Sequence, residues 1–304
     1  MLIHPVSIPN RQELVINWHV TEACNFGCRY CYSHWEKPAS KRELVHDAIR
    51  SARLIEELSA FFSPSNRANP LANEFKWTSV RLNLAGGEPL LYERRIVEIA
   101  QQARSHGLDL SVITNASRLN NALMTELAGL LSLFGISVDS SDAARNQLIG
   151  RVSRTGQALQ LPNLTEMIAH GRALNPTLRL KINTVVNSLN WDENMTELIK
   201  QLAPDRWKVL RMLPSTTSDL AVTAEQFKAF VTRHANQGLP MCAEDNADMV
   251  QSYIMIDPHG RFYQNGTGKS GYSYSMPIPD VGAANAFAQY EFSVSRYLAR
   301  YTAV

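Results

Sequence analysis

Six short apolar segments alternate with longer segments of helical periodicity, and no other feature constrains the fold of this chain more. The expected strands are Leu14–Val20, Val80–Ala85, Asp109–Thr114, Phe134–Val138, Leu178–Val185 and Trp207–Leu213. The expected helices are Lys41–Phe62, Glu93–His106, Asn121–Leu131, Leu161–Leu174 and Asn194–Leu202. Mostly apolar strands that alternate with helices favour a parallel sheet covered by helices. We therefore predict an α/β fold, a partial (β/α)6 barrel over residues 1–213.

The pattern changes after Pro214. We expect a helix at Ala224–His234, a β-hairpin at Tyr253–Gln264 and then a glycine-rich segment, NGTGKSGYSYS. Residues 214–304 are therefore predicted to form a C-terminal α+β extension that caps the barrel. Within the barrel, Ser63–Trp77 is rich in proline and asparagine and is expected to be a loop.

The charge balance excludes functions that depend on a strong overall field. The 304 residues include 30 Lys and Arg against 28 Asp and Glu, a net charge of +2. So small a charge does not recruit nucleic acid or an acidic membrane surface. The first residues lack the pattern of a secretion signal, and no apolar stretch approaches the ~18 residues of a spanning helix. We expect a cytoplasmic monomer that binds neither nucleic acid nor membrane.

Three cysteines, Cys24, Cys28 and Cys31, follow the first expected strand in the sequence CNFGCRYC. A structural zinc site usually has four ligands, often as two separated pairs, and this chain has no second pair. Three thiolates can hold three irons of a [4Fe–4S] cluster, which leaves the fourth iron open to a small chelating molecule. S-adenosylmethionine (SAM) suits that position. A chance group of buried thiols is the alternative, and the fourth cysteine, Cys242, is predicted to be structural.

A second motif, LAGGEP, ends the second expected strand at Leu84–Pro89. Its two glycines let the backbone approach a ligand closely. Together with the cysteine loop it resembles the radical SAM superfamily, with its CxxxCxxC cluster loop and its Gly-Gly-Glu-Pro motif. The resemblance implies a radical SAM barrel with a [4Fe–4S] cluster on Cys24, Cys28 and Cys31, and SAM as the second cofactor.

Further segments resemble the viperin-like members of that superfamily, in order and at similar spacing. They are INWHVTEACN, RLNLAGGEP, ISVDSSDAARNQLIGR, LKINTVVNSLN, DENMTELI, RWKVLRML, QSYIMID and PDVG. They cover most of the chain from Leu14 to Ala288. The amphipathic N-terminal extension of animal viperins is missing, which favours a cytosolic prokaryotic type. The final segment is short or altered after Val281, so ligand contacts are not carried over to it.

The resemblance implies a nucleotide dehydratase. A 5′-deoxyadenosyl radical from SAM would remove the 4′ hydrogen of a ribonucleoside triphosphate, namely CTP, UTP or GTP. Loss of the 3′ hydroxyl as water, with one electron and one proton, would give the 3′-deoxy-3′,4′-didehydro nucleotide, a chain-terminating antiviral product. A flavodoxin or ferredoxin is implied as electron donor. Two alternatives stay open: another radical SAM enzyme, such as a peptide modifier or a nucleotide cyclase, and a non-enzymatic iron–sulfur or zinc module.

Cations and asparagines fall on the expected inner strands. In RLNLA and in LKIN, a cation and an asparagine stand two residues apart, so each pair points to one face of its strand. Cations in apolar strands are costly without a partner, and a triphosphate is such a partner. The resemblance carries nucleotide binding onto Asn17, Arg81, Asn83, Lys181, Asn183, Arg206 and Lys208. Arg81 replaces a lysine of the animal enzymes, which offers phosphate a planar fork.

Residues at the strand ends are expected to bind SAM, because ligands bind at the carboxyl ends of barrel strands. The expected cofactor-binding residues are Tyr30, Gly86, Gly87, Glu88, Thr114, Asn115, Ser137, Asp139 and Arg151. Glu88 would hold the methionine amino group, and Arg151 either the methionine carboxylate or the nucleotide phosphates. The resemblance makes Tyr253 the catalytic residue that delivers a hydrogen or proton late in the reaction. A tyrosine simply packed in the hairpin is the alternative. Base recognition is expected from residues 150–157 and 265–274.

Overall fold

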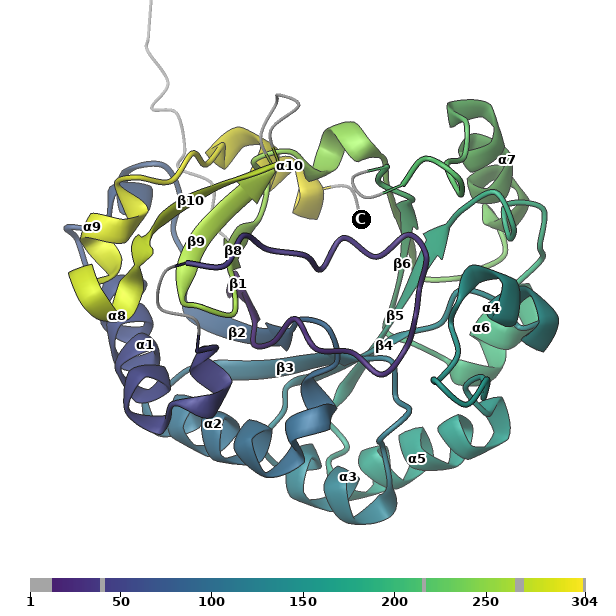
Figure 1. The fold of residues 1–304 in the computed structure, drawn as a ribbon, viewed down its shortest axis with the longest axis horizontal. Helices are drawn as coiled ribbons and strands as arrows, with labels where there is room; N and C mark the ends of the chain where they lie inside the picture. Colours follow the sequence, from purple (N-terminus) through teal and green to yellow (C-terminus); the bar gives the residue numbers. More distant parts are fainter. Residues whose placement is uncertain (1–12, 39–41, 215–216, 266–270, 303–304) are drawn as a thin grey trace, which may run out of the picture.

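The fold is described by a computed structural model over residues 13–38, 42–214, 217–265 and 271–302 (Figure 1). Its centre is a curved ten-stranded sheet in the order β10-β9-β8-β1-β2-β3-β4-β5-β6-β7. The core strands are β1 (Glu13–His19), β2 (Ser79–Ala85), β3 (Asp109–Thr114), β4 (Leu133–Ser137), β5 (Arg179–Val186) and β6 (Arg206–Arg211). They pair in parallel and in chain order, which confirms the predicted partial barrel.

Helices cover the convex side of this sheet (Figure 1). They are α1 (Ala48–Phe61), α2 (Glu93–Ser105), α3 (Asn121–Ala128), α5 (Leu161–Leu174) and α6 (Thr196–Leu202). Outward side chains of the strands, such as Trp18 and Leu82, are fully buried in the core that these helices cover. Because side chains alternate along a strand, the inward positions are left to carry polar groups. None of the helices in the described ranges combines the length and the apolar composition that crossing a membrane requires.

The start of α1 differs from the prediction of a helix at Lys41–Phe62. The helix begins at Ala48, because the side chain of Asp47 accepts a hydrogen bond from Arg50 N and caps it. A separate 3-10 turn at Leu44–His46 precedes the cap. Lys41 itself lies outside the described residues.

Other predicted elements are confirmed closely. β3, α5 and α7 (Ala224–His234) have the predicted bounds. The loop predicted at Ser63–Trp77 contains a 3-10 turn, Pro70–Asn73, which Asn69 caps. Helix α4 (Ala143–Ile149) was absent from the predicted elements, because Ile149 is its one buried residue and its apolar periodicity is weak.

The chain after residue 213 adds strands to both edges of the core sheet. β7 (Met241–Glu244) pairs in parallel with β6, and β8 (Ile254–Ile256) pairs in parallel with β1. β9 (Arg261–Asn265) and β10 (Tyr272–Pro277) continue in antiparallel fashion, which confirms the predicted hairpin. The helices that follow are α8 (Ile278–Val281), α9 (Ala283–Phe287) and α10 (Val294–Thr302). Residue 213 as a domain boundary stays a prediction, and residues 266–270 of the glycine-rich segment lie outside the described residues.

Candidate active site

The cysteine loop follows β1 and crosses the mouth of the barrel, where the carboxyl ends of the core strands meet (Figure 1). Cys24, Cys28 and Cys31 are partly exposed on this loop. Gly27 N donates a 3.2 Å hydrogen bond to Gly150 O, in the segment that follows α4. Gly150 has a φ of +84°, and a Cβ there would lie 2.2 Å from Gly27 O. This close approach therefore requires glycine at position 150.

The donor set of the loop fits an iron–sulfur cluster better than a single metal ion. Within the part of the chain that the structure describes, no three His, Cys, Asp or Glu side chains converge on one metal ion. Three thiolates can instead each bind a different iron of a [4Fe–4S] cluster. Burial raises the pKa of Cys28 to about 11, although the charge of Arg151 opposes the shift. Cluster binding must therefore displace a proton from this thiol.

The Gly86–Gly87–Glu88 turn packs directly on the start of the cysteine loop. Gly86 has a φ of +141°, and a Cβ there would lie 2.6 Å from Thr21 O. A Cβ at Gly87 would lie 2.2 Å from Ala23 O. Gly87 N donates to Thr21 O (2.7 Å) and Glu88 N donates to Ala23 O (2.8 Å). The two glycines thus let the motif hold the backbone that leads to Cys24.

The Glu88 carboxylate is fully buried and faces the end of β3. It accepts hydrogen bonds from Leu90 N (3.0 Å), Thr114 Oγ1 (2.6 Å) and Asn115 N (2.7 Å). Burial raises the pKa of Glu88, and these three donors oppose the rise. Asn115 Nδ2 in turn lies 3.8 Å from Cys24 Sγ. Glu88 therefore braces the end of β3 against the cysteine loop.

A buried cluster, called the clamp below, joins the other side of the cysteine loop to the end of β4. It consists of Tyr30, Ser137, Asp139 and Arg151. Tyr30 donates its hydroxyl hydrogen bond to Asp139, and Arg151 Nε lies 3.5 Å from the same carboxylate. Arg151 also donates to Ser137 O (2.6 Å) and lies 3.6 Å from Cys28 Sγ. Burial raises the pKa of Asp139, and the charge of Arg151 opposes this shift. The clamp brings together four predicted cofactor-binding residues next to the cysteines.

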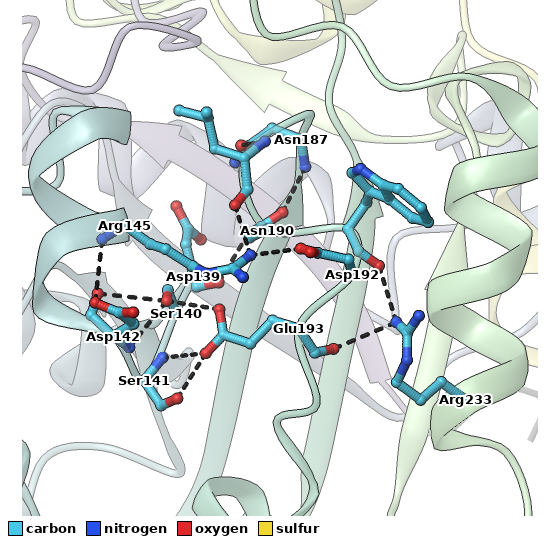
Figure 2. Close-up of polar contacts among 12 residues, drawn as sticks. Asp139, Ser140, Ser141, Asp142, Arg145, Asn187, Asn190, Asp192, Glu193 and Arg233 are labelled. Atoms are coloured by element: carbon cyan, nitrogen blue, oxygen red, sulfur yellow. Dashed lines mark hydrogen bonds and ion pairs between the residues drawn. The ribbon is translucent and has the colours of Figure 1, made fainter.

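Glu193, after β5, holds the loop that carries Asp139 (Figure 2). Its carboxylate accepts hydrogen bonds from Ser140 Oγ (2.6 Å), Ser141 N (2.8 Å) and Ser141 Oγ (2.6 Å). Asn190 Nδ2 donates to Asp139 O (2.8 Å). Figure 2 shows these side chains converging on the loop from the segment after β5. The clamp is therefore supported by a second set of hydrogen bonds, which restricts its movement.

We expect Asp139→Asn to destabilise the protein strongly, because it leaves Arg151 buried without its ion-pair partner. Breaking a buried pair typically costs ~3–5 kcal/mol. The matched control is Asp219→Asn, which removes an exposed pair with Arg29 (3.8 Å) at the same loop and should cost ~0–1 kcal/mol. Urea denaturation of the cluster-free protein measures both. Equal losses in the two variants would contradict the clamp.

A cavity of about 190 Å³ lies inside the barrel, next to Tyr30 and Tyr32 of the cysteine loop. Its apolar lining includes Leu210, Met249 and Met255. Its polar lining includes Asn17, His19, Asn83, Lys181, Asn183, Lys208, Arg211 and Tyr253. Five predicted nucleotide-binding residues and the predicted catalytic residue therefore share one cavity.

Arg81 and Arg206 do not line this cavity. Arg81 donates to Glu13 Oε2 (2.8 Å) and to Ser111 Oγ (2.6 Å). Arg206 Nη2 lies 3.1 Å from Cys242 Sγ. In the sheet, Arg81 stands one inward position before Asn83 and therefore nearer the amino ends of the strands. Of the four expected cations, two therefore line the cavity, Lys181 and Lys208. Arg211, which was not predicted, also lines it and pairs with Asp245 (3.1 Å).

The amides of the cavity are partly committed to each other. Asn83 Nδ2 donates to Asn17 Oδ1 (3.0 Å), and Ser111 Oγ donates to Asn83 Oδ1 (2.6 Å). Asn183 Oδ1 is buried and has no hydrogen-bond partner among the described residues. A buried acceptor of this kind favours a ligand with a hydroxyl or amine donor.

Lys181 lies in the cavity among other positive charges. Burial, followed by the charges of Lys208, Arg206 and Arg81, holds the pKa of Lys181 well below its usual range. The charge of Glu244 opposes this shift, and its effect is smaller than those of the three cations. An anion in the cavity would relieve this repulsion.

Several residues around the cavity were not predicted from the sequence. Ser111, Glu244 and Arg300 are buried and contact predicted site residues. A lone charge in the strand MCAE or near the chain end carries no local signal of a site. The loop expected to read the base, residues 150–157, contributes Ser153, Thr155 and Gln157 to a second cleft of about 340 Å³ beside Phe26.

This chain is similar to known proteins in both sequence and fold. Residues 18–163 match the family model of the radical SAM superfamily. The chain is 42% identical to the S-adenosylmethionine-dependent nucleotide dehydratase of Psychrobacter lutiphocae, over 95% of both chains. It is 40% identical to the protein of that name from Pseudoalteromonas ulvae, over 100% of this chain and 97% of the other. The solved structure of native anSMEcpe with bound AdoMet and Kp18Cys peptide has a TM-score of 0.67 at 12% identity, covering 94% of this chain and 84% of that one. That last likeness shows a shared fold.

Proposed function

The chain belongs to the S-adenosylmethionine-dependent nucleotide dehydratases of the radical SAM superfamily, and from this premise we propose its substrate and chemistry. The substrate is a ribonucleoside triphosphate: CTP, UTP or GTP. The product is the 3′-deoxy-3′,4′-didehydro analogue, a chain-terminating antiviral nucleotide. The reaction takes hydrogen from the ribose 4′ carbon and releases the 3′ hydroxyl as water. An external one-electron donor, of the flavodoxin or ferredoxin class, completes the balance.

The residues at the mouth of the barrel are proposed to hold both cofactors. When bound, the [4Fe–4S] cluster and SAM supply the radical that takes hydrogen from the ribose. Cys24, Cys28 and Cys31 would bind three irons and leave the fourth to SAM. Around SAM we propose Tyr30, Gly86, Gly87, Glu88, Thr114, Asn115, Ser137, Asp139 and Arg151. Their dense hydrogen bonding supports this proposal, because a site fixed in advance spends less binding energy on ordering itself.

The placement of Lys181 in the cavity is the observation that carries the choice of substrate. Lys181, Lys208 and Arg211 line the cavity, and Arg81 and Arg206 are close enough to add to the field at Lys181. This excess of positive charge favours a polyanion such as a triphosphate. The amides of Asn17, Asn83 and Asn183 are proposed to fix the ribose, so that its 4′ carbon stays within reach of the radical. A peptide substrate fits this lining less well, because its backbone is neutral. The single cysteine outside the loop, Cys242, also gives no ligand set for the extra clusters of many peptide modifiers.

Isotope transfer tests this function. The reconstituted enzyme, with reductant and SAM, is offered CTP, UTP, GTP or ATP deuterated only at the 4′ position. With the preferred nucleotide, deuterium should appear in 5′-deoxyadenosine, and the nucleotide product should have lost one water and its deuterium. Asn83→Ala should lower product per 5′-deoxyadenosine formed, by up to about a hundredfold, because a misplaced ribose reacts poorly. Retention of the 4′ deuterium with every nucleotide would rule the mechanism out.

A further inference from the structure

Over the described residues, the sheet of the partial barrel does not close on itself, and a cluster of charged side chains links its edge strand β7 to the residue before β8. The described sheet ends at β7 on one side and at β10 on the other. Glu244 comes from β7, Lys208 from β6, and Tyr253 directly precedes β8. Arg300 comes from α10 near the end of the chain. Four elements that are distant in sequence therefore meet at the edge of the cavity.

Tyr253 lies at the centre of this cluster. Its hydroxyl donates a hydrogen bond to Glu244 and accepts one from Lys208 Nζ. The guanidinium carbon of Arg300 lies 3.3 Å from the centroid of the Tyr253 ring. The backbone is also fixed, because Tyr253 O accepts a hydrogen bond from Gln264 Nε2 (3.0 Å). The ring, the hydroxyl and the backbone of Tyr253 are thus all held in place.

Glu244 links the other members. Its Oε1 lies 2.9 Å from Lys208 Nζ and 3.3 Å from Arg300 Nη2. The side chains of Glu244, Lys208 and Arg300 are 3%, 7% and 6% exposed. Burial would raise the pKa of Glu244, but the charges of Lys208 and Arg300 hold it at about 2. Glu244 is therefore an ionised carboxylate that accepts the phenolic hydrogen bond at neutral pH.

We propose that Glu244 and Arg300 are positioning residues that prepare Tyr253 to give up its electron and proton, with Glu244 and Lys208 passing that proton on. This inference rests on the proposed function. Arg300 holds the ring by stacking, and Glu244 holds the hydroxyl proton. Lys208 reaches both Glu244 and the cavity, so it is placed to return a proton to the substrate.

Loss of the 4′ hydrogen atom leaves a radical at the ribose 4′ carbon and does not change the charge of the nucleotide. One electron from Tyr253 and one proton from the Lys208 ammonium release the 3′ hydroxyl as water and leave the alkene. The phenolic proton moves to Glu244 and from there to Lys208, which restores both charges. Tyr253 is left as a neutral radical, and the external one-electron donor with one solvent proton restores it.

Glu244→Gln tests the proposal, because it keeps the size and the hydrogen-bond acceptor but cannot take a proton. With the 4′-deuterated preferred nucleotide, deuterium should still reach 5′-deoxyadenosine, while dehydrated product per 5′-deoxyadenosine falls about a hundredfold or more. Nucleotide affinity should change less than threefold. Glu98→Gln, the same change on the outer helix α2, should leave the product ratio unchanged. Equal product ratios in Glu244→Gln and the wild type would overturn the proposal.

Variants of Tyr253 and Arg300 keep the test decisive if Glu244→Gln folds poorly. Tyr253→Phe keeps the ring stacked on Arg300 and should show the same uncoupling. Arg300→Ala should uncouple the reaction, and Arg300→Lys should restore it only in part, because lysine lacks the planar face. Arg296→Ala, one turn earlier on α10 and exposed, is the matched control. Uncoupling by Arg296→Ala, or none by Arg300→Ala, would overturn the role of Arg300. Absence of deuterium transfer in the wild type would instead refute the proposed function.

Discussion

Replacement of Cys28 by alanine should abolish iron retention and all nucleotide dehydration. With two thiolates left, the loop cannot hold a [4Fe–4S] cluster firmly, and without it no radical can form. The loss should therefore be complete, unlike that of variants that only misplace the substrate. Iron content after anaerobic reconstitution, the brown colour of the protein and 5′-deoxyadenosine formation measure it. Cys24→Ala and Cys31→Ala should behave in the same way.

Cys242→Ala is the matched control for these variants. Cys242 is buried on β7, where its sulfur contacts Arg206 and not the cysteine loop. Its replacement removes one buried sulfur, so we expect a stability loss of about 1 kcal/mol with iron content unchanged. Loss of iron from Cys242→Ala would show that the cluster does not depend on three ligands alone.

The helices and strands that could be predicted from the sequence are those with a clear local hydrophobic pattern. β3 and α5 have the predicted bounds, because each is an uninterrupted segment with one clear periodicity. The radical SAM resemblance rests on fixed spacings within one loop and one turn, and the family match confirms it. The strand β7 has four residues, too few to show a period, and it was not predicted.

The layer of the barrel that each inward side chain enters depends on strand register, and no local sequence pattern specifies that register. Arg81 and Lys181 occupy the same cation-x-Asn pattern, and both point inward. Yet Arg81 meets Glu13, at the start of β1, while Lys181 lines the cavity. Pairing between strands decides which inward layer a side chain enters, and this pairing is set by contacts distant in sequence. For the same reason Glu244 and Arg300 could not be placed beside Tyr253 in advance.

Lys181 is the residue at which stability and function conflict. Its pKa is lowered well below its ordinary value of 10.5, so the folded protein binds fewer protons there than the unfolded chain. Stability therefore rises as pH increases toward 10.5, and the cost of this lysine is fully present below its folded pKa. A bound polyanion would reverse the shift and draw a proton onto Lys181. Nucleotide binding should therefore raise the pKa of Lys181. At a pH between the free and bound pKa values the protein takes up a proton on binding, which calorimetry in buffers of different ionisation enthalpy detects.

Lys181→Met should accordingly make the ligand-free protein more stable while it weakens nucleotide binding. Replacement of a poorly compensated cation by an apolar side chain of similar length is expected to add ~1 kcal/mol or more to the free energy of unfolding at neutral pH. Loss of a charge-assisted contact to phosphate should weaken nucleotide affinity about 10- to 100-fold. Lys200→Met, on the exposed face of α6 beside Glu197, removes the same charge and should change neither quantity. Urea denaturation and nucleotide titration of both variants measure the two effects. A Lys181→Met protein that is less stable than the wild type would show that Lys181 does not destabilise the ligand-free protein. A variant that binds nucleotide as well as the wild type would show that Lys181 does not contact the phosphates.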